Sequence, residues 1–385
     1  MRVLAACSLG GSGHLNPLLP FLAGAQRRGD ETLVVGPPAL RELVELAGYA
    51  FRAGGEPPEA EVAAMRERLP AAPPREASVL ANRELFGRLA TTAMLAAMER
   101  TCVEWRPDLV LREPVEYASA VVGRRLGIRT AQVAISLAEV ETGSITAAAP
   151  VLEAHQSGLV ADLGASPYLT RLPASLDPSP FPATVRFHEL ATGSARPLGD
   201  WWNGSQAPLV YMTFGTVLGH MSIAAGVYRA ALEAVEGMNA RVLLTVGRRF
   251  DPATLGPIPD NVRVEAWVDQ VDVLEEADLV VCHGGSGTVF GALAGGVPLV
   301  IVPLFADQFE NGRRIAQAGA GLIVEAGQGG APGSRRVIAE DARRIAEAIE
   351  AVLAMRSYQD QSRRIAAEMA ATATVDQVLA ALLAG

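Results

Sequence analysis

The chain alternates short apolar runs with helix-length segments, and it does so twice. In the first half, runs at Arg2–Cys7, Glu31–Val35 and Asp108–Leu111 have the length and composition of buried strands. After a proline-rich boundary the rhythm restarts with Leu209–Thr213 and Arg241–Val246. Strands that alternate with helices predict parallel sheets covered by helices. We therefore expect an α/β protein with two Rossmann-like parallel-sheet domains facing across a cleft.

The boundary is the stretch from residue 164 to residue 207. Proline recurs there at six positions, and no helical or strand periodicity is visible. Such composition is typical of a linker. We expect an N-terminal domain at 1–190, a linker at 191–207 and a C-terminal domain at 208–385, with the final helix free to pack back on the N-terminal domain. The 385 residues suffice for two cores.

Composition excludes several classes of function. The net charge of −9 argues against a nucleic-acid partner. All 33 basic residues are arginine, which removes mechanisms that need a Schiff-base, P-loop or protein-kinase lysine. No apolar run reaches about 18 residues, so no membrane span is expected. The widely separated Cys7, Cys102 and Cys282 predict buried thiols and a cytoplasmic protein rather than disulfides or a zinc site.

A glycine-rich loop, His283-Gly-Gly-Ser-Gly-Thr288, follows the predicted strand Leu279–Cys282 and leads into a predicted helix. Such a loop presents backbone N–H groups at the positive end of a helix, an arrangement that binds phosphate. Ser286 and Thr288 add hydroxyl donors, and His283 lies at the sheet edge where α/β proteins place ligands. By themselves, the glycines are also compatible with a tight turn, and His283 by itself is also compatible with a purely structural histidine. Their combination favours a diphosphate site.

The same loop permits a rival interpretation. Gly285, Gly287 and Gly291 resemble a dinucleotide-binding fingerprint, although the third glycine is one position late. Asp307 follows Gly285 by 22 residues, near the spacing of a ribose-binding acid. A nicotinamide-dependent oxidoreductase is therefore the alternative enzyme. A hydrolase is disfavoured because the chain has no Gly-x-Ser-x-Gly elbow.

A second glycine-rich loop, Gly10–Gly13, follows the first predicted strand and precedes His14. A helix is expected to begin at Asn16-Pro17, because asparagine caps helices and proline fits the first turn. His14 would then lie just before a helix N-terminus, which favours a neutral ring able to accept a proton. Glu113 is the candidate partner, since a carboxylate fixes the tautomer of a histidine. Glu116 is a weaker alternative, and the competing interpretation makes both carboxylates surface helix caps.

Two variable apolar segments, 56–100 and 138–150, are expected to be loops that build an acceptor pocket. The first opens with a proline-rich loop and becomes helical. Its apolar side chains near helical spacing are Leu85, Leu89, Met94 and Met98. A helix packed on the sheet is the favoured interpretation, and a flexible apolar lip around a ligand is the alternative.

Together these motifs resemble a known family, the GT-B-fold nucleotide-sugar glycosyltransferases. The motifs are Gly-Gly-x-Gly-His-Leu-Asn-Pro near the start, Val210-Tyr-Met-Thr-Phe-Gly-Thr216, and Trp267-x-x-Gln270…His283-Gly-Gly-Ser-Gly-Thr288…Pro303-Leu-Phe-Ala-Asp307-Gln308-x-x-Asn311. More narrowly, the chain resembles bacterial enzymes that glycosylate antibiotics and other natural products. The resemblance spans nearly the whole chain.

The resemblance implies a role for each motif residue. Trp267 would stack on a pyrimidine base, and Thr216 would reach a phosphate from the side opposite His283. Asp307 and Gln308 would bind sugar hydroxyls. The full set implied for the nucleotide and diphosphate is Thr216, Trp267, Val268, Gln270, His283, Gly285, Ser286, Gly287 and Thr288. The residues implied for the acceptor side are the base His14, its orienting partner Glu113, and the loop residues Gly11, Ser12 and Gly13.

The implied reaction is direct displacement at the anomeric carbon with inversion, from a nucleotide diphosphate sugar to a hydroxyl of a hydrophobic small molecule. No Asp-x-Asp triplet occurs, so neither a metal nor a cofactor beyond the co-substrate is expected, as in the resembled family. Plant members carry a ribose-binding glutamate where this chain has Gly291, which favours a thymidine diphosphate (TDP) sugar over a uridine diphosphate (UDP) sugar. The non-enzymatic alternative is a silent relative that activates another enzyme. Both a monomer and a homodimer fit the sequence.

Overall fold

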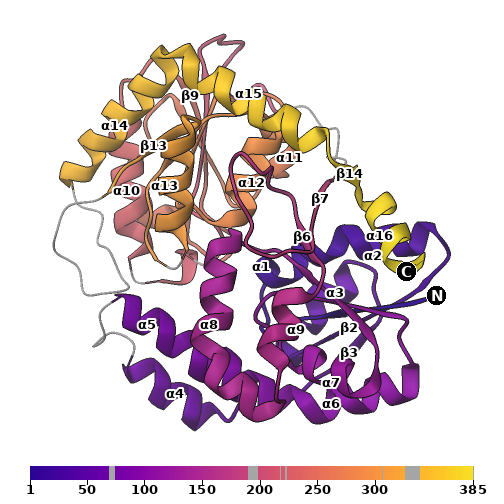
Figure 1. Cartoon of the computed structure of the whole chain (residues 1–385). Coiled ribbons are helices and arrows are strands. Elements are labelled where there is room, and N and C mark those ends of the chain that lie inside the picture. The colour runs from indigo at the N-terminus through magenta and orange to yellow at the C-terminus, as the bar shows by residue number, and fades with distance from the viewer. Residues whose placement is uncertain are drawn as a thin grey trace. The chain divides into compact units, whose positions relative to one another are not determined.

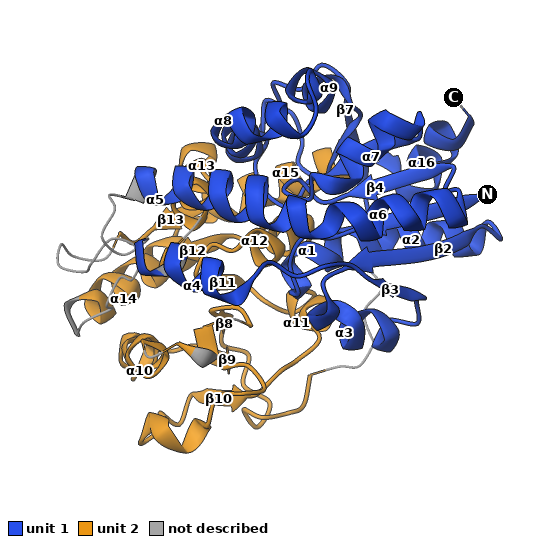
Figure 2. Cartoon of the chain, turned by 90° about the horizontal axis from the view of Figure 1, so that it is seen from below, with its two compact units in different colours: residues 1–189, 372–385 blue, residues 190–371 orange. Residues whose placement is uncertain are grey.

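The structure, a computed structural model, describes residues 1–68, 74–189, 198–216, 218–221, 223–305, 307–325 and 339–384. The chain forms two units, Met1–Glu189 with Thr372–Gly385 (unit 1) and Leu190–Ala371 (unit 2), which Figure 2 colours separately. Unit 1 thus includes residues 372–385, so the final helix, which is expected within 208–385 but free to pack back on the N-terminal domain, belongs to unit 1. The expected linker at 191–207 lies partly outside the described residues.

Unit 1 is built on a parallel sheet with the strand order β14-β7-β6-β5-β4-β1-β2-β3. The strands are β1 (Arg2–Ala6), β2 (Glu31–Gly36), β3 (Phe51–Ala53), β4 (Leu109–Arg112), β5 (Arg129–Val133), β6 (Tyr168–Thr170), β7 (Thr184–His188) and β14 (Ala373–Thr374). The strand order reverses direction between β1 and β4. In open α/β sheets, ligands bind beyond the carboxyl ends of the strands at such a point.

Helices cover both faces of this sheet. They are α1 (Ser12–Leu15), η1 (Asn16–Leu18), α2 (Leu19–Arg27), η2 (Pro38–Leu40), α3 (Arg41–Leu46), α4 (Glu59–Arg68), α5 (Pro74–Leu80), the π-helical η3 (Ala81–Ala90), α6 (Thr91–Trp105), α7 (Ala118–Leu126), α8 (Ala138–His155), α9 (Leu159–Ala165) and α16 (Val375–Ala384). Side chains of β1 alternate between the faces, as the strand period of two requires. Val3 and Ala5 share a core with α2 and α16, which pack together (Figure 1), whereas Leu4 and Ala6 share one with α6 and α7.

Two expectations for unit 1 were wrong. The stretch from 164 to 207 contains two strands, β6 and β7, which are short and flanked rather than interrupted by prolines. Residues 138–150 are not a loop but most of helix α8, which accommodates Pro150. The core interpretation of the preceding segment is confirmed for Met94 and Met98, which are buried against the sheet.

Unit 2 is built on a second parallel sheet with the order β10-β9-β8-β11-β12-β13. Its strands are β8 (Leu209–Thr213), β9 (Arg241–Thr245), β10 (Val262–Glu265), β11 (Leu279–Cys282), β12 (Leu299–Ile301) and β13 (Gly321–Ile323). Its helices are η4 (Leu218–His220), α10 (Ala224–Val235), η5 (Pro252–Leu255), α11 (Gln270–Leu274), α12 (Ser286–Ala294), α13 (Gln308–Ala318), α14 (Ala339–Ala354) and α15 (Arg356–Ala370). This order is that of a doubly wound Rossmann sheet, and it reverses between β8 and β11.

The core of unit 2 follows from the same alternation. Val210 and Met212 of β8 pack with α10 and α14, and Ile345 and Ile349 of α14 are buried. All three cysteines are buried free thiols, also as expected. Among the described residues, no helix combines the length and apolarity needed to cross a membrane.

Candidate active site

The first candidate constellation lies where the sheet of unit 1 reverses. Ala6 pairs with Arg112 at the ends of β1 and β4, so the segments that follow both strands leave the same sheet edge. There the Nδ1 atom of His14 lies 3.3 Å from the Oε2 atom of Glu113. The structure therefore brings together the histidine and the carboxylate that the sequence analysis paired.

Glu113 is completely buried, and its carboxylate accepts several hydrogen bonds. Oε1 accepts from the backbone N–H of Ser8 (3.0 Å) and from the Ser8 hydroxyl, and Oε2 accepts from the N–H of Val115 (2.8 Å). Burial alone would raise the pKa of Glu113. The charge of a protonated His14 and the hydrogen bonds from His14, Ser8 and Val115 outweigh burial, so the pKa falls. Glu113 is therefore a fixed anion beside His14.

The expected helix start was wrong. The helix begins at Ser12, with Gly11 in an extended conformation before it, and Asn16 has helical angles. His14 thus lies within the first helical turn rather than before it. Pro17 did not mark the start because the chain passes into the 3₁₀ turn η1, whose first positions tolerate proline.

The loop ahead of His14 borders open space. Ser12 is half-buried and Gly13 is exposed. A Cβ atom at Gly11 or Gly13 would meet no atom within 4 Å. The backbone at Gly11 and Gly13 is therefore not covered by other described parts of the protein.

Glu116 is bound to the start of α7. It is buried, and its carboxylate accepts from the N–H of Ser119 (3.1 Å) and from the Ser119 hydroxyl at the start of α7. Burial raises its pKa to about 7. Neither Glu113 nor Glu116 is the surface cap of the competing interpretation, because both lie in the interior.

A buried arginine supports the segment that carries Glu113. Arg112 donates from Nη1 to the carbonyl oxygens of Glu113 (3.2 Å) and Pro114 (3.0 Å), and from Nη2 to Gln132. The Gln132 amide donates to Glu141 Oε2 at 2.9 Å. The sequence pattern did not predict these hydrogen bonds of Arg112 and Gln132. The available signal was a charged residue at the end of the apolar strand β4.

The second constellation lies where the sheet of unit 2 reverses, after β8 and β11. Gly284 has φ +89°, a left-handed conformation that suits glycine, and Gly285 is the extended residue before α12. The His283 ring fills the space beside two glycines. A Cβ at Gly215 would lie 2.8 Å from His283 Nε2, and one at Gly285 would lie 2.4 Å from it. Both positions therefore require glycine.

The start of α12 offers N–H groups. Ser286 and Gly287 make no backbone N–H hydrogen bond within the described residues, whereas Thr288 donates its N–H to the Gly285 carbonyl at 3.1 Å. The helix that follows the glycine-rich loop begins at Ser286. Burial lowers the pKa of His283 to about 4, against the opposing charge of Asp307, so the ring is neutral near pH 7.

Asp307 and Gln308 both engage the protein itself. The Ser286 hydroxyl donates to Asp307 Oδ2 at 2.9 Å. Gln308 is buried, and its Oε1 accepts from the N–H groups of Leu304 (2.8 Å) and Phe305 (2.9 Å). The oxygen of Gln308 is thus occupied in holding the loop after β12.

Asn311 braces this site, although it was only part of the motif and was assigned no role. Its Nδ2 donates to the Gly284 carbonyl at 2.8 Å and to Ser286 Oγ at 3.0 Å. Asn311 therefore ties the first turn of α13 to the glycine loop.

The remaining nucleotide candidates lie after β8 and β10. Thr216 is exposed in the turn after β8, and Val268 is half-buried. The Trp267 side chain is 53% exposed, and the Arg248 guanidinium lies 4.8 Å from the centre of its ring. The buried Nε2 of Gln270, at the start of α11, would lie 3.4 Å from a Cβ at Gly291 and has no hydrogen-bond partner in the described part of the chain.

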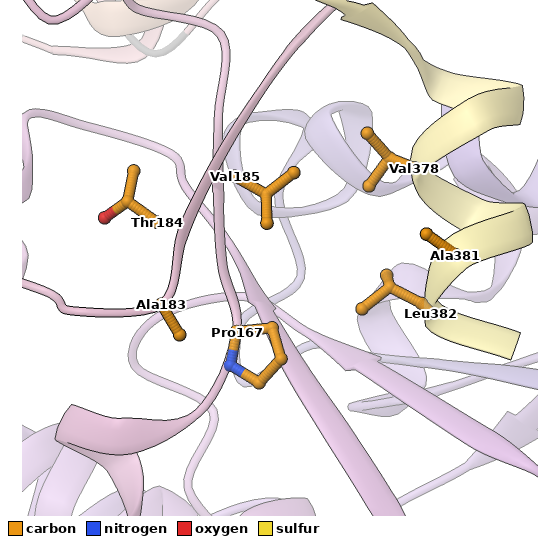
Figure 3. A pocket seen from close by; sticks show the side chains of 7 residues that line it. All are labelled: Pro167, Ala183, Thr184, Val185, Val378, Ala381 and Leu382. Atoms are coloured by element: carbon orange, nitrogen blue, oxygen red, sulfur yellow. The ribbon is translucent and has the colours of Figure 1, made fainter. Parts of the chain in front are cut away.

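A separate apolar pocket of about 290 Å³ lies in unit 1 between β6, β7 and α16 (Figure 3). Its lining residues are Pro167, Ala183, Thr184, Val185, Val378, Ala381 and Leu382. None of these side chains titrates, and none belongs to either constellation. Within the described ranges, no group of three or more His, Cys, Asp or Glu side chains is arranged to hold a metal.

Comparison with known proteins identifies the family. Residues 27–215 match the family described as erythromycin biosynthesis protein CIII-like, N-terminal domain, and residues 229–384 match its C-terminal domain. The chain is 31% identical over 379 residues to L-demethylnoviosyl transferase of Streptomyces niveus, covering 96% of this chain and 94% of that protein. It is 32% identical over 351 residues to elloramycin glycosyltransferase ElmGT of Streptomyces olivaceus, covering 84% and 85%.

Solved structures confirm the expected fold. Spinosyn rhamnosyltransferase SpnG has a TM-score of 0.78 at 22% identity, covering 99% of this chain and 100% of that chain, and it is also known in complexes with thymidine diphosphate and with spinosyn aglycone. The glycosyltransferase SnogD from Streptomyces nogalater has a TM-score of 0.72 at 24% identity, covering 100% and 99%. The chain therefore belongs to the erythromycin CIII-like family, and it is a GT-B-fold glycosyltransferase of the antibiotic-biosynthesis type.

Proposed function

We propose that the protein is an inverting glycosyltransferase that moves a sugar from a TDP-sugar to a hydroxyl group of a hydrophobic small molecule. The observation that carries this proposal is the 3.3 Å approach of His14 Nδ1 to the buried Glu113 carboxylate. In the deprotonated imidazole of His14, the carboxylate held by Ser8 and Val115 would keep the remaining proton on Nδ1. It leaves Nε2 with a lone pair for an acceptor hydroxyl.

In the proposed step, His14 Nε2 takes the proton of the acceptor hydroxyl as its oxygen attacks the anomeric carbon. The bond from that carbon to the diphosphate breaks on the opposite side, so the configuration inverts. Glu113 stabilises the imidazolium that forms. The open space beside Gly11 and Gly13 supports placing the acceptor here.

The proposed donor site is the loop of unit 2. The free N–H groups of Ser286 and Gly287 and the N-terminus of α12 would stabilise the charge that grows on the leaving diphosphate. Neutral His283 would contribute a hydrogen bond rather than a charge. Trp267 would stack on the base beside Val268 and Gln270, and Thr216 would reach a phosphate. We propose no resident metal or cofactor, because the sequence lacks the Asp-x-Asp triplet of metal-clamped donors.

Two observations refine the proposed ligands. SpnG is known with thymidine diphosphate and with spinosyn aglycone, which supports a TDP donor and a hydrophobic acceptor. Position 291, where plant relatives carry a ribose-binding glutamate, holds a glycine that faces Gln270. We propose that Asp307 and Gln308 bind hydroxyl groups of the donor sugar.

The test is turnover on a panel of hydrophobic hydroxyl compounds with TDP-glucose and UDP-glucose. Product mass identifies transfer, and the anomeric proton coupling identifies inversion. His14→Ala is expected to lower kcat by about 10²- to 10⁴-fold while the variant still binds TDP. Near wild-type turnover in that variant would remove His14 as the base. Nucleotide binding without transfer to any acceptor would instead favour a silent activator protein.

A further inference from the structure

The proposed diphosphate site lacks a positive charge of its own. A nucleoside diphosphate brings at least two negative charges, and the loop from His283 to Thr288 contains no arginine. His283 is neutral near pH 7. Asp307, which accepts a hydrogen bond from Ser286, adds a further negative charge at 2.9 Å from that hydroxyl. A cation from another segment would therefore add to the stabilisation that the N–H groups of this loop can give a bound diphosphate.

Arg248 lies in the turn that follows β9 and is exposed. Its guanidinium lies 4.8 Å from the centre of the Trp267 ring. It forms no hydrogen bond and no ion pair with any residue in the described part of the chain. A guanidinium over an indole face gains cation–π attraction, which restricts the side chain without using its N–H donors. Arg248 therefore keeps its donors free.

Two comparable arginines in unit 2 differ in this respect. Arg263 stacks on Trp201 and also pairs with Glu265 at 2.5 Å. Arg241 stacks on Trp202 and also donates to the Ala207 carbonyl at 2.7 Å. Both have an acceptor from the protein. Arg248 has the same aromatic contact but, among the residues that the structure describes, no acceptor.

Packed loops connect Arg248 to the glycine loop. A Cβ at Gly219, just after β8, would lie 3.1 Å from the Val246 carbonyl oxygen and 3.4 Å from Phe250 Cβ, so the segments after β8 and β9 are in contact. Gly215, in the same segment after β8, lies against the His283 ring. The segment after β8 thus contacts both the turn that carries Arg248 and the His283 ring, and all three lie at the same edge of the sheet.

We propose that Arg248 is a nucleotide-binding residue that supplies the positive charge for the diphosphate of the sugar donor. Trp267 holds the guanidinium at the edge where the base stacks. The planar guanidinium then donates to phosphate oxygens as the diphosphate enters, a geometry that suits this side chain. This inference rests on the proposed function, because it assigns a residue to the same donor site.

The test measures the Kd of TDP by calorimetry for the wild-type protein and three variants. Arg248→Gln removes the charge, Arg248→Lys keeps it, and Arg249→Gln removes the neighbouring exposed charge of the same turn. Arg248→Gln is expected to weaken TDP binding by about 10- to 100-fold, the range for a lost charge-assisted hydrogen bond. Arg248→Lys, which keeps the charge but loses the planar guanidinium, is expected to bind with an affinity between those of wild type and Arg248→Gln, and Arg249→Gln is expected to stay within about twofold of wild type.

The outcomes separate this inference from the proposed function. If the wild-type protein binds neither TDP nor UDP, the proposed function fails. If the wild-type protein binds TDP and Arg248→Gln binds it equally well, only the role of Arg248 is overturned. A loss in Arg248→Lys as large as that in Arg248→Gln also overturns it, because the planar stack on Trp267 rather than the charge would then matter. Unchanged melting temperatures show that the variants are folded.

Discussion

Ser8 and His14 hold opposite oxygens of one buried carboxylate. Ser8 donates its N–H and its hydroxyl to Oε1 of Glu113, while His14 Nδ1 lies 3.3 Å from Oε2. The carboxylate cannot rotate without breaking bonds on both sides. The orientation of the His14 ring therefore depends on Ser8, which follows β1, as well as on Glu113, which follows β4.

Replacing Glu113 with glutamine is expected to lower kcat by about 10²- to 10⁴-fold, because an amide can present its NH₂ group to Nδ1 and select the wrong tautomer of His14. Steady-state kinetics with saturating donor and acceptor measure the effect. Glu99→Gln, an exposed carboxylate on α6, is the control and should behave as wild type. Full activity in Glu113→Gln would show that the carboxylate does not assist His14.

Ser8 is expected to act as a positioning residue. Ser8→Ala removes the hydroxyl bond to Glu113 but keeps the backbone bond at 3.0 Å. We expect kcat to fall about tenfold with KM nearly unchanged, since roughly 1.5 kcal/mol is typical for a hydrogen bond to a charged group. Ser8→Thr, which restores a hydroxyl, should recover part of the loss. Equal kcat values for the alanine variant and the wild type would contradict this role.

Two glycines of the donor loop make a matched pair. Gly285→Ala places a Cβ 2.4 Å from His283 Nε2, so we expect a loss of about 1–3 kcal/mol in unfolding free energy and weaker TDP binding. Gly287→Ala meets no atom within 4 Å inside a helix, so its stability should be unchanged or about 0.5–1 kcal/mol higher. Chemical denaturation of both variants tests this contrast. Equal destabilisation of the two would contradict the packing of His283 against Gly285.

Glu116 gives stability a pH dependence. Burial raises its folded-state pKa to about 7, above the unfolded value of 4.5. The stability that the protonated form contributes is present below pH 4.5 and is lost as the pH rises through 7, a change on the order of 3 kcal/mol. Glu116→Gln cannot titrate but keeps an oxygen for the Ser119 N–H. The unfolding free energy of Glu116→Gln minus that of wild type should therefore be larger at pH 8 than at pH 5.

Denaturation at the two pH values measures this difference. Glu141, whose pKa burial raises to about 8, contributes to both proteins and cancels in the comparison. The exposed-site variant Glu99→Gln should show the wild-type pH dependence. If the unfolding free energy changes equally between pH 5 and pH 8 in wild type and in Glu116→Gln, Glu116 does not have the raised pKa that its burial implies.

The sheets could be predicted from the sequence because strands buried on both faces are continuous apolar runs, as in Leu209–Thr213 and Leu279–Cys282. Strand β6 was not predicted because its three residues, which lie between two prolines, are too few to show the two-residue alternation of a strand. The start of α1 was misplaced because Asn16-Pro17 has good capping chemistry, while the extended Gly11 that begins the helix has no side chain to reveal it.

The paired residues His14 and Glu113 were predictable because each follows a strand, and adjacent parallel strands end at one edge. Ser8 follows the same strand as His14, yet its hydroxyl points to a residue 105 positions away. The chain from Arg112 through Gln132 to Glu141 depends on side-chain directions in the packed core. Sequence spacing does not encode such directions, so these supports emerged only from the structure.

Thermal stabilisation by TDP, UDP and NADH, compared at one common ligand concentration of about 100 times the dissociation constant of TDP, tests the proposed donor site. A ligand that binds only the folded protein should add about 2.7 kcal/mol at that excess. We expect TDP to stabilise the protein more than UDP does, and NADH not to stabilise it. Stabilisation by NADH without any response to TDP or UDP would contradict the donor site proposed at Trp267 and the His283 loop.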